Sequence, residues 1–232
     1  MAEAAVISKK EAVIKFGKKE RKLLTDPLND NNPITVQVLG ICSALAVTTG
    51  MKNAAVMAVA VVFVAMFSNL ITSLLRKSIP KQVRMIVQLV IIATLVTIVE
   101  LTLKAVAFES YKQLSVFIGL IITNCIIMGR LEAFAMANKP YESLLDGIGN
   151  GFGYGIILLA VAFFREFFGK GEIFGVKIIG PTTDHLLNTT ALSWLSWYEN
   201  NNLMVLFPSA MFVIAVLIWA HRAWNPRLID VS

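Results

Sequence analysis

Two cysteines are the residues of this 232-residue chain best suited to hold a soft metal or to carry redox chemistry. Cys42 lies in the apolar stretch VLGICSALAV, and Cys125 lies 83 residues further along, in LIITNCIIMGR. Structural iron and zinc sites usually take four protein ligands, and the sequence has neither a CxxC pair nor a Cys/His cluster. If the two thiols hold a metal centre, another chain must therefore supply the remaining ligands.

A purely structural interpretation of the same cysteines competes with this one. Free cysteine is in most proteins a small, buried hydrophobic residue, so two of them in an apolar chain need no special purpose. Two cysteines also exclude a disulfide scaffold, which needs several pairs. Their spacing alone leaves both interpretations open.

The composition is that of a protein with several membrane-spanning segments. Hydrophobic residues make up 56% of the chain and charged residues only 16%. The formal net charge of +6 does not indicate nucleic-acid binding, because seven of the 21 basic residues precede residue 23 and most of the others flank apolar blocks. The expected surroundings are membrane lipid and other proteins, not nucleic acid.

Six apolar segments are expected to form transmembrane helices in an all-α polytopic fold. They cover residues 34–49, 54–75, 83–103, 114–129, 147–168 and 203–220. A helix needs about 20 residues to cross the hydrocarbon core, so the first and fourth segments are short, and each holds one cysteine. The order short, long, long occurs twice, which predicts a 3+3 inverted repeat with a short or broken first helix in each half.

The distribution of lysine and arginine predicts the orientation. With a cytoplasmic N-terminus and six crossings, 15 of the 21 basic residues lie inside and six outside. Within the N-terminal tail, ISKKEAVIKFGKKERKLL is either a basic helix on the membrane surface or a solvated tail. The predicted organisation is a cytoplasmic basic tail (1–33), a first three-helix repeat (34–103), a second repeat (114–222) with an outer loop (171–202), and a cytoplasmic tail (223–232).

This arrangement places both cysteines near the middle of the membrane. Cys42 lies eight residues beyond Ile34, which is about 12 Å of helix. Cys125 lies eleven residues beyond Leu114, where the chain enters from the opposite face, which is about 16 Å. The repeat could therefore bring the two thiols together.

Several glycines and charged residues have structural interpretations. Gly147, Gly151 and Gly155 stand at i, i+4 and i+8 and predict a face for close helix packing, not a phosphate loop. Gly40 and Gly129, near the cysteines, permit helix breaks or close approaches, although ordinary packing explains them equally well. Four charged residues near segment ends are interpreted as ordinary interfacial or structural groups: Glu100, Asp146, Arg165 and Glu166.

Three stretches resemble a known family. They are DNNPITVQVLGICSALAVTT, QLSVFIGLIITNCIIMGRLEAFA and DGIGNGFGYG. They are similar to the D/E-type membrane subunits of sodium-translocating NADH:quinone oxidoreductase and of the related Rnf complexes. The likeness covers about residues 30–222. Ser43 and the glycine stretch look more like the D-type members, because proline usually follows the first cysteine in the Rnf counterpart.

The resemblance implies a cofactor and a partner. In this family, a D-like and an E-like subunit form a pseudosymmetric pair that shares an intramembrane [2Fe-2S] cluster. The matching positions are Cys42 and Cys125, as metal ligands, with no catalytic residue in this chain. NAD, flavins and quinone belong to other subunits of the complex, so the chain is an enzyme subunit that is not catalytic alone. The implied location is the bacterial inner membrane, with both termini cytoplasmic.

Other functions remain open from the sequence. One is an E-type subunit of an Rnf ferredoxin:NAD oxidoreductase. A second, of a different class, is a secondary transporter, since inverted repeats with short first helices are typical of that class. A transporter needs polar side chains near the midplane, and the sequence offers mainly Ser43, Thr123 and Asn124 there. A purely structural membrane anchor is the third.

Overall fold

The computed structural model describes residues 18–28, 31–106, 117–169, 172–173, 176–177 and 206–225. Within them the chain is helical apart from its turns and one short hairpin, in which β1 (Glu172–Ile173) pairs antiparallel with β2 (Val176–Lys177). The helices are α2 (Lys18–Thr25), the 3₁₀ helix η1 (Asp26–Leu28), α3 (Ile41–Val47), α4 (Met51–Leu75), α5 (Arg84–Val106), α7 (Cys125–Arg130), the π-helix η2 (Leu131–Ala135), α8 (Pro140–Gly169) and α9 (Phe207–Trp224). Residues 117–122 are helical as well. The all-α prediction is confirmed.

Four stretches of the described chain are long and apolar enough to cross a membrane. They are Met51–Leu75, Arg84–Ala105, Phe117–Ala135 and Pro140–Gly169, and a shorter apolar helix covers Pro208–Trp224. The long segments predicted from the sequence at 54–75, 83–103 and 147–168 are therefore helices of spanning length. The described residues thus contain four helices of spanning length. The predicted count of six crossings is not confirmed.

The predicted first segment, 34–49, is not one continuous helix. Only Ile41–Val47 is helical. Before it, the backbone N–H groups of Ile34 and Thr35 donate to Asn32 Oδ1 at 3.0 and 3.3 Å, which folds the chain into a turn. Val38 and Gly40 then have positive φ angles of 57° and 77°, a conformation that a right-handed helix cannot contain.

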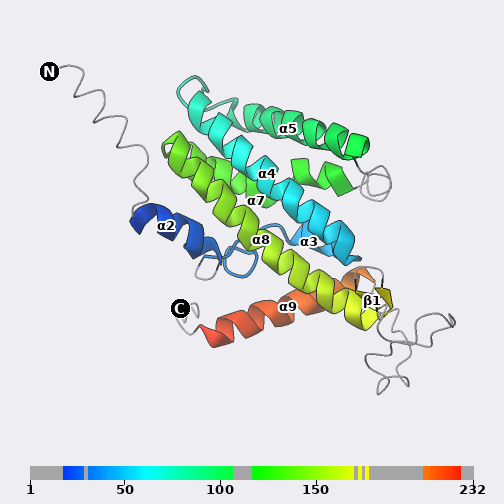
Figure 1. Ribbon diagram of the computed structural model, residues 1–232. Helices are drawn as coiled ribbons and strands as arrows, with labels where there is room; N and C mark the ends of the chain where they lie inside the picture. The colour runs from blue at the N-terminus through cyan, green and yellow to red at the C-terminus, as the bar shows by residue number, and fades with distance from the viewer. Residues whose placement is uncertain are drawn as a thin grey trace.

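Helices α4 and α8 form the centre of the fold through the predicted glycine face (Figure 1). A Cβ added to Gly147 would lie 2.7 Å from the Ala65 carbonyl oxygen, and one added to Gly151 would lie 2.9 Å from Val62 Cα. At Gly155 the nearest atom is Ala58 Cβ, at 3.2 Å. Glycine lets the two backbones approach this closely, which confirms the packing role predicted for this face.

The opposite face of α8 carries a second pair of glycines, and the N-terminal segment packs on it. A Cβ on Gly149 would lie 2.7 Å from the Leu23 carbonyl oxygen, and one on Gly153 would overlap the Pro27 carbonyl oxygen. Asn32 Nδ2 donates to the Gly153 carbonyl at 3.2 Å. Residues 18–28 are thus part of the folded bundle, whereas residues 1–17 of the predicted tail lie outside the described residues.

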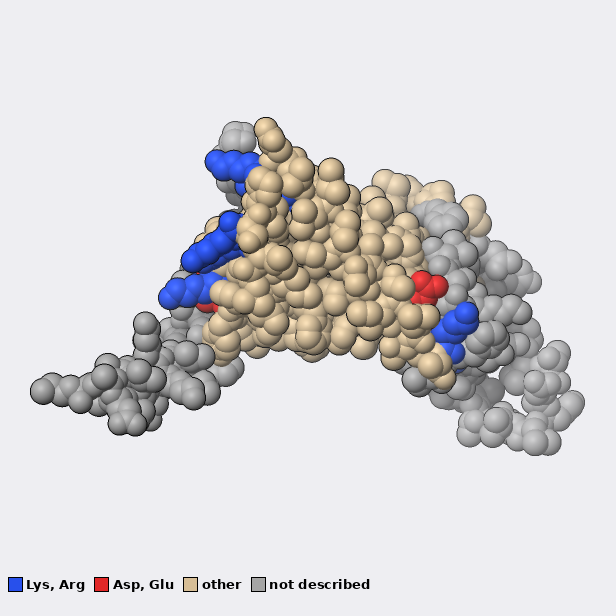
Figure 2. Space-filling view, turned by 90° about the horizontal axis from the view of Figure 1, so that it is seen from above, with Lys and Arg blue, Asp and Glu red and all other residues tan. Residues whose placement is uncertain are grey.

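The outer surface of the bundle is apolar. Large side chains of α4 and α9 point outward, with Val59 71% exposed and Phe212 75% exposed. Several polar side chains are instead fully buried between helices, among them Asn69, Thr72 and Gln88. Figure 2 shows a broad band without Lys, Arg, Asp or Glu, with charged residues towards its two edges. An apolar outside and a polar-containing inside are the pattern of a multi-pass membrane protein.

Candidate functional site

Cys42 stands in the first turn of a short helix that begins inside the bundle. Gly40 is the N-cap residue of α3, and its φ of 77° turns the chain into the helix. The residues after the cysteine, Ser43 and Ala44, are buried at 3% and 0% exposure, whereas the Cys42 side chain is exposed. The helix thus anchors its neighbours in the core and presents the thiol outward.

Cys125 has an equivalent position. The helix over 117–122 is interrupted at Thr123 and Asn124, and α7 restarts with Cys125 as its first residue. Asn124 caps the new helix, because its Oδ1 accepts the Ile126 N–H at 3.2 Å. Ile126 and Ile127 are each 1% exposed, whereas the Cys125 side chain is exposed. As at Cys42, a helix starts at a break in the chain and places a cysteine on the surface.

The structure brings the two cysteine segments together. A Cβ on Gly40 would lie 2.5 Å from Ile126 Cδ1 and 3.4 Å from Asn124 Oδ1. Gly40 is therefore required twice, for its positive φ and for this close approach. Gly129 is less constrained, because a Cβ there would make only an ordinary 3.4 Å contact with Leu39 Cδ1. The two helix breaks pack directly against each other.

The exposure of both thiols bears on the two interpretations of the cysteines. A cysteine kept as a small hydrophobic residue is expected inside the core, but neither Cys42 nor Cys125 is buried within this chain. No group of three or more His, Cys, Asp or Glu side chains forms a metal site within the described part of the chain. Both thiols are thus accessible to a group from outside this chain.

Two charged side chains of α8 hold the turn between α3 and α4. Arg165, which is 1% exposed, donates to Thr48 Oγ1 at 2.6 Å, to the Leu45 carbonyl at 3.3 Å and to the Leu206 carbonyl at 3.2 Å. Glu166 accepts the N–H of Met51, the first residue of α4. These bonds satisfy backbone groups at the end of one helix and the start of the next, which agrees with the structural role predicted for both residues.

Asp146 differs from its prediction. The sequence predicts an ordinary interfacial acid, but Asp146 is 1% exposed. Its carboxylate accepts two hydrogen bonds from the Arg130 guanidinium, one of them from Nε at 2.9 Å, and its Oδ1 also accepts from Asn150 Nδ2 at 3.1 Å. The partner on α7 explains the difference, because a buried carboxylate is tolerated where it is paired and hydrogen-bonded.

Tyr154 is a residue at the site for which the sequence analysis predicts no role. It is 0% exposed, and its hydroxyl lies 2.8 Å from Ser43 Oγ, beside Cys42. The sequence feature that could have indicated it is a single tyrosine within the glycine-rich stretch GFGYG. A large side chain among packing glycines on one helix indicates a specific contact.

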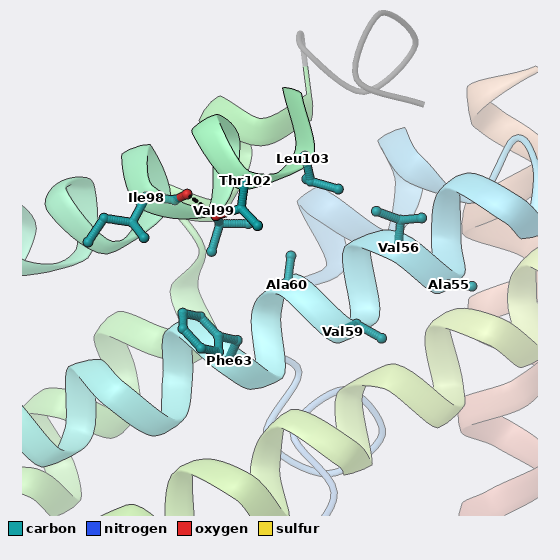
Figure 3. Close-up of a pocket in the computed structure, with 9 residues that line it drawn as sticks. All are labelled: Ala55, Val56, Val59, Ala60, Phe63, Ile98, Val99, Thr102 and Leu103. Carbon is teal, nitrogen blue, oxygen red and sulfur yellow. Dashed lines mark hydrogen bonds between the residues drawn. The ribbon is translucent and has the colours of Figure 1, made fainter. Parts of the chain in front are cut away.

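A cavity of about 480 Å³ lies between α4 and α5, and neither cysteine lines it (Figure 3). The residues lining it are Ala55, Val56, Val59, Ala60, Phe63, Ile98, Val99, Thr102 and Leu103. Its one polar side chain, Thr102, donates its hydroxyl to the Ile98 carbonyl of its own helix at 2.8 Å. Thr102 is therefore the one polar side chain in an otherwise apolar lining.

Comparisons with known proteins agree on a family. The profile described as "Rnf-Nqr subunit, membrane protein" matches residues 21–218. Three relatives, each named as the D subunit of Na(+)-translocating NADH-quinone reductase, are similar to this chain over most of both lengths. They come from Photobacterium profundum (52% identical, covering 93% of this chain and 98% of the relative), Pasteurella multocida (53%, 92% and 98%) and Pseudomonas paraeruginosa (53%, 90% and 90%). The resemblance to D-type members predicted from the motifs is confirmed.

The matched region begins at α2 and ends within α9, so it includes both helix breaks and the whole α4–α8 centre. Spanning helices, an apolar surface and this continuous match lead to the same assignment. The chain belongs to the Rnf-Nqr family of membrane subunits.

Proposed function

We propose that this chain is the D-type membrane subunit of a sodium-translocating NADH:quinone oxidoreductase, and that Cys42 and Cys125 are half the ligands of an intramembrane [2Fe-2S] cluster. The observation that carries the proposal is the pair of exposed thiols at two helix breaks that pack against each other. An E-like homologous subunit supplies the other two thiolates. NADH, flavins and quinone bind to other subunits, so the chain has no catalytic residue of its own.

The residues at the site fit such a cluster. Cysteine thiolates are the usual ligands of [2Fe-2S] centres, and a cluster bound there supplies a one-electron relay. Cys42 and Cys125 stand on adjacent segments, and the apolar side chains beneath them, such as Ile126, keep water from the inner side of the site. Because both thiols face outward, a second subunit can reach them without rearrangement of this chain. The chain's role is to fix two ligands in place and to exclude water behind them.

We also propose the predicted 3+3 inverted repeat. In the half over 34–103, the short α3 precedes α4 and α5, and in the half over 114–222, the broken 117–135 segment precedes α8 and α9. The helix contacts support this equivalence, because α4 packs on both α5 and α7, just as α8 packs on both α9 and α3. Each cysteine then occupies the corresponding break in its own half.

The membrane orientation follows the charge bias. With both termini in the cytoplasm, the tails over 1–33 and 223–232 lie inside, and the 171–202 loop lies outside the bacterial inner membrane. This proposal rests on the 15-to-6 distribution of basic residues.

Reporter fusions test this orientation. A cytoplasm-active reporter and a periplasm-active reporter are fused in turn to the C-terminus and into the 171–202 loop. We expect the C-terminal fusion to be active only in the cytoplasm and the loop fusion only in the periplasm, because an odd number of crossings separates them. If both positions report the same side, the proposed topology is wrong.

The alternative functions have less support. The three D-type relatives at 52–53% identity favour the Nqr complex over an Rnf complex. The cavity between α4 and α5 has Thr102 as its one polar side chain, so it does not itself suit a polar substrate.

Purification through a tag on this chain tests the proposed function directly. We expect the tagged chain to recover a multi-subunit complex that contains non-haem iron and reduces quinone with NADH at a sodium-stimulated rate. The matched control is the same tag on an unrelated polytopic membrane protein from the same cells, which should recover none of these. Recovery of this chain alone, or of a complex that reduces ferredoxin but not quinone, would contradict the proposal.

A further inference from the structure

Tyr154 is a buried residue that bonds the Cys42 segment from the inner side. It lies on α8, with 0% exposure, between glycines that pack on α4 and on the N-terminal segment. Its ring is enclosed, so its hydroxyl has a fixed position. That hydroxyl lies 2.8 Å from the hydroxyl of Ser43, the residue after Cys42.

The hydrogen bond to the Cys42 segment has a defined direction. Ser43 Oγ donates to the Gly40 carbonyl at 3.0 Å. A serine hydroxyl has one proton to donate, so the 2.8 Å contact between the two hydroxyls is a donation from Tyr154 to Ser43 Oγ. The tyrosine thus extends the turn that Gly40 makes at the start of α3.

The Cys125 segment packs on the same turn. A Cβ on Gly40 would lie 3.4 Å from Asn124 Oδ1 and 2.5 Å from Ile126 Cδ1. Asn124 is 3% exposed, and its Oδ1 accepts the Ile126 N–H at 3.2 Å. The hydrogen bonds from Tyr154 to Ser43 and from Ser43 to the Gly40 carbonyl therefore end at the turn against which the second helix break packs.

We infer that Tyr154 is a positioning residue, whose hydroxyl holds the helix breaks of Cys42 and Cys125 in a single arrangement and so sets the placement of the two thiols. The inference deepens the proposed function and rests on it where it concerns the metal centre. The Tyr154 hydroxyl ties the Gly40 turn to α8, and that turn packs on Ile126 and Asn124 of the second break. Moving the turn would therefore break a hydrogen bond away from water and disturb the contact between the two breaks.

Tyr154→Phe is the direct test, because it removes the hydroxyl and keeps the buried ring. The chain has only two cysteines, so an intrachain bis-maleimide product can join only Cys42 to Cys125. It is measured in the purified complex after its iron has been removed with a chelator under reducing conditions, and mass spectrometry of this chain separates it from cross-links to the thiols of the proposed partner. We expect the rate of the Cys42–Cys125 cross-link to fall about two- to tenfold, which corresponds to one net hydrogen bond. In the iron-loaded complex, the variant should keep its iron but change the electron paramagnetic resonance g-values and the midpoint potential of the centre.

Two further variants separate positioning from packing. Tyr141→Phe, at the partly exposed start of α8, is the matched control and should leave both the cross-linking rate and the spectrum unchanged. Ser43→Ala should also lower the rate, and the double variant should be slowed by less than the two single effects combined, because both variants remove the bond between the two hydroxyls, while Ser43→Ala also removes the bond to the Gly40 carbonyl. Additive effects would mean that the two hydroxyls act separately, and would overturn the inference.

The remaining outcomes also decide the question. A Tyr154→Phe complex with the rate and spectrum of the parent overturns the inference. If that variant does not assemble, Ser43→Ala decides alone, and an unchanged cross-linking rate in it overturns the inference. Full iron in cysteine-to-serine variants would instead remove the proposed cluster, while the cross-linking rates would still report whether Tyr154 holds the two segments together.

Discussion

Replacing either Cys42 or Cys125 by serine is expected to remove the iron of one [2Fe-2S] cluster from the purified complex and to abolish quinone reduction by NADH. Serine keeps the size of the side chain, but its oxygen is a much poorer ligand for an iron–sulfur cluster than a soft thiolate. Since both side chains are exposed in this chain, the packing of α3 and α7 should survive the change. The loss is therefore one of ligation, not of folding.

The pattern of lost activities identifies the step. Electrons from NADH should still reach an artificial acceptor on the cytoplasmic side, whereas quinone reduction and sodium transport should fail together. Iron analysis, the two electron-acceptor assays and sodium uptake into vesicles measure this. Thr123→Ser, an exposed change in the same helix break as Cys125, is the control and should retain full iron. If each cysteine variant assembles with full iron and full quinone reductase activity, the ligand assignment is refuted and the cysteines are structural.

Gly151→Leu is expected to prevent recovery of the intact complex. The nearest atoms to a Cβ at this position belong to Val62, with Cα at 2.9 Å and Cγ2 at 3.1 Å. Backbone atoms cannot turn aside as the end of a flexible side chain can, so α4 and α8 would have to separate. Overpacking of this kind typically costs about 1–3 kcal/mol for small insertions, which is the loss we expect for Gly151→Ala, and leucine should exceed it.

The measurement is the amount of complex recovered from membranes, together with its melting temperature in detergent. Gly119→Ala is a matched helical control, since a Cβ there would meet no atom within 4 Å, and it should be recovered like the parent. We also expect the order Gly119→Ala, Gly151→Ala, Gly151→Leu in decreasing melting temperature. Normal recovery of the leucine variant would show that the contact between α4 and α8 is looser than these distances require.

The sequence predicted those features that repeat along one helix. Gly147, Gly151 and Gly155 share one face by spacing alone, and that face does pack closely. Spacing does not say which helix packs there, because the choice of α4 depends on contacts between segments more than 80 residues apart. The sequence analysis does not predict that Gly149 and Gly153 also form a packing face. The segment that packs on them, α2 and η1, belongs to the predicted N-terminal tail, which was not expected to contact the bundle.

The sequence names Cys42 and Cys125 as candidate ligands, and that assignment stays a prediction. It does not show how the two helix breaks around them are built. Gly40 gave a signal for a break, because glycine alone adopts a φ of 77° readily. The second break is harder to predict from the sequence. Asn124 favours a helix start, but it acts as a cap here because the preceding helix ends at this point. Asp146 was misjudged because its partner, Arg130, belongs to a different helix. In each case the deciding contact is tertiary, and a local pattern does not contain it.

The double-sided packing of α8 has a consequence for the order in which the chain is made. Asn32 bonds Gly153, 121 residues later, and Ser43 bonds Tyr154, 111 residues later. A chain emerging from the ribosome forms its N-terminal structure first, yet here the surfaces on which α2 and α3 settle are synthesised in the second half. The contacts that complete the turn before Cys42 can therefore form only once α8 has been inserted. If the proposed cluster is bound, it would be loaded only after translation has passed α8, into an almost finished polypeptide.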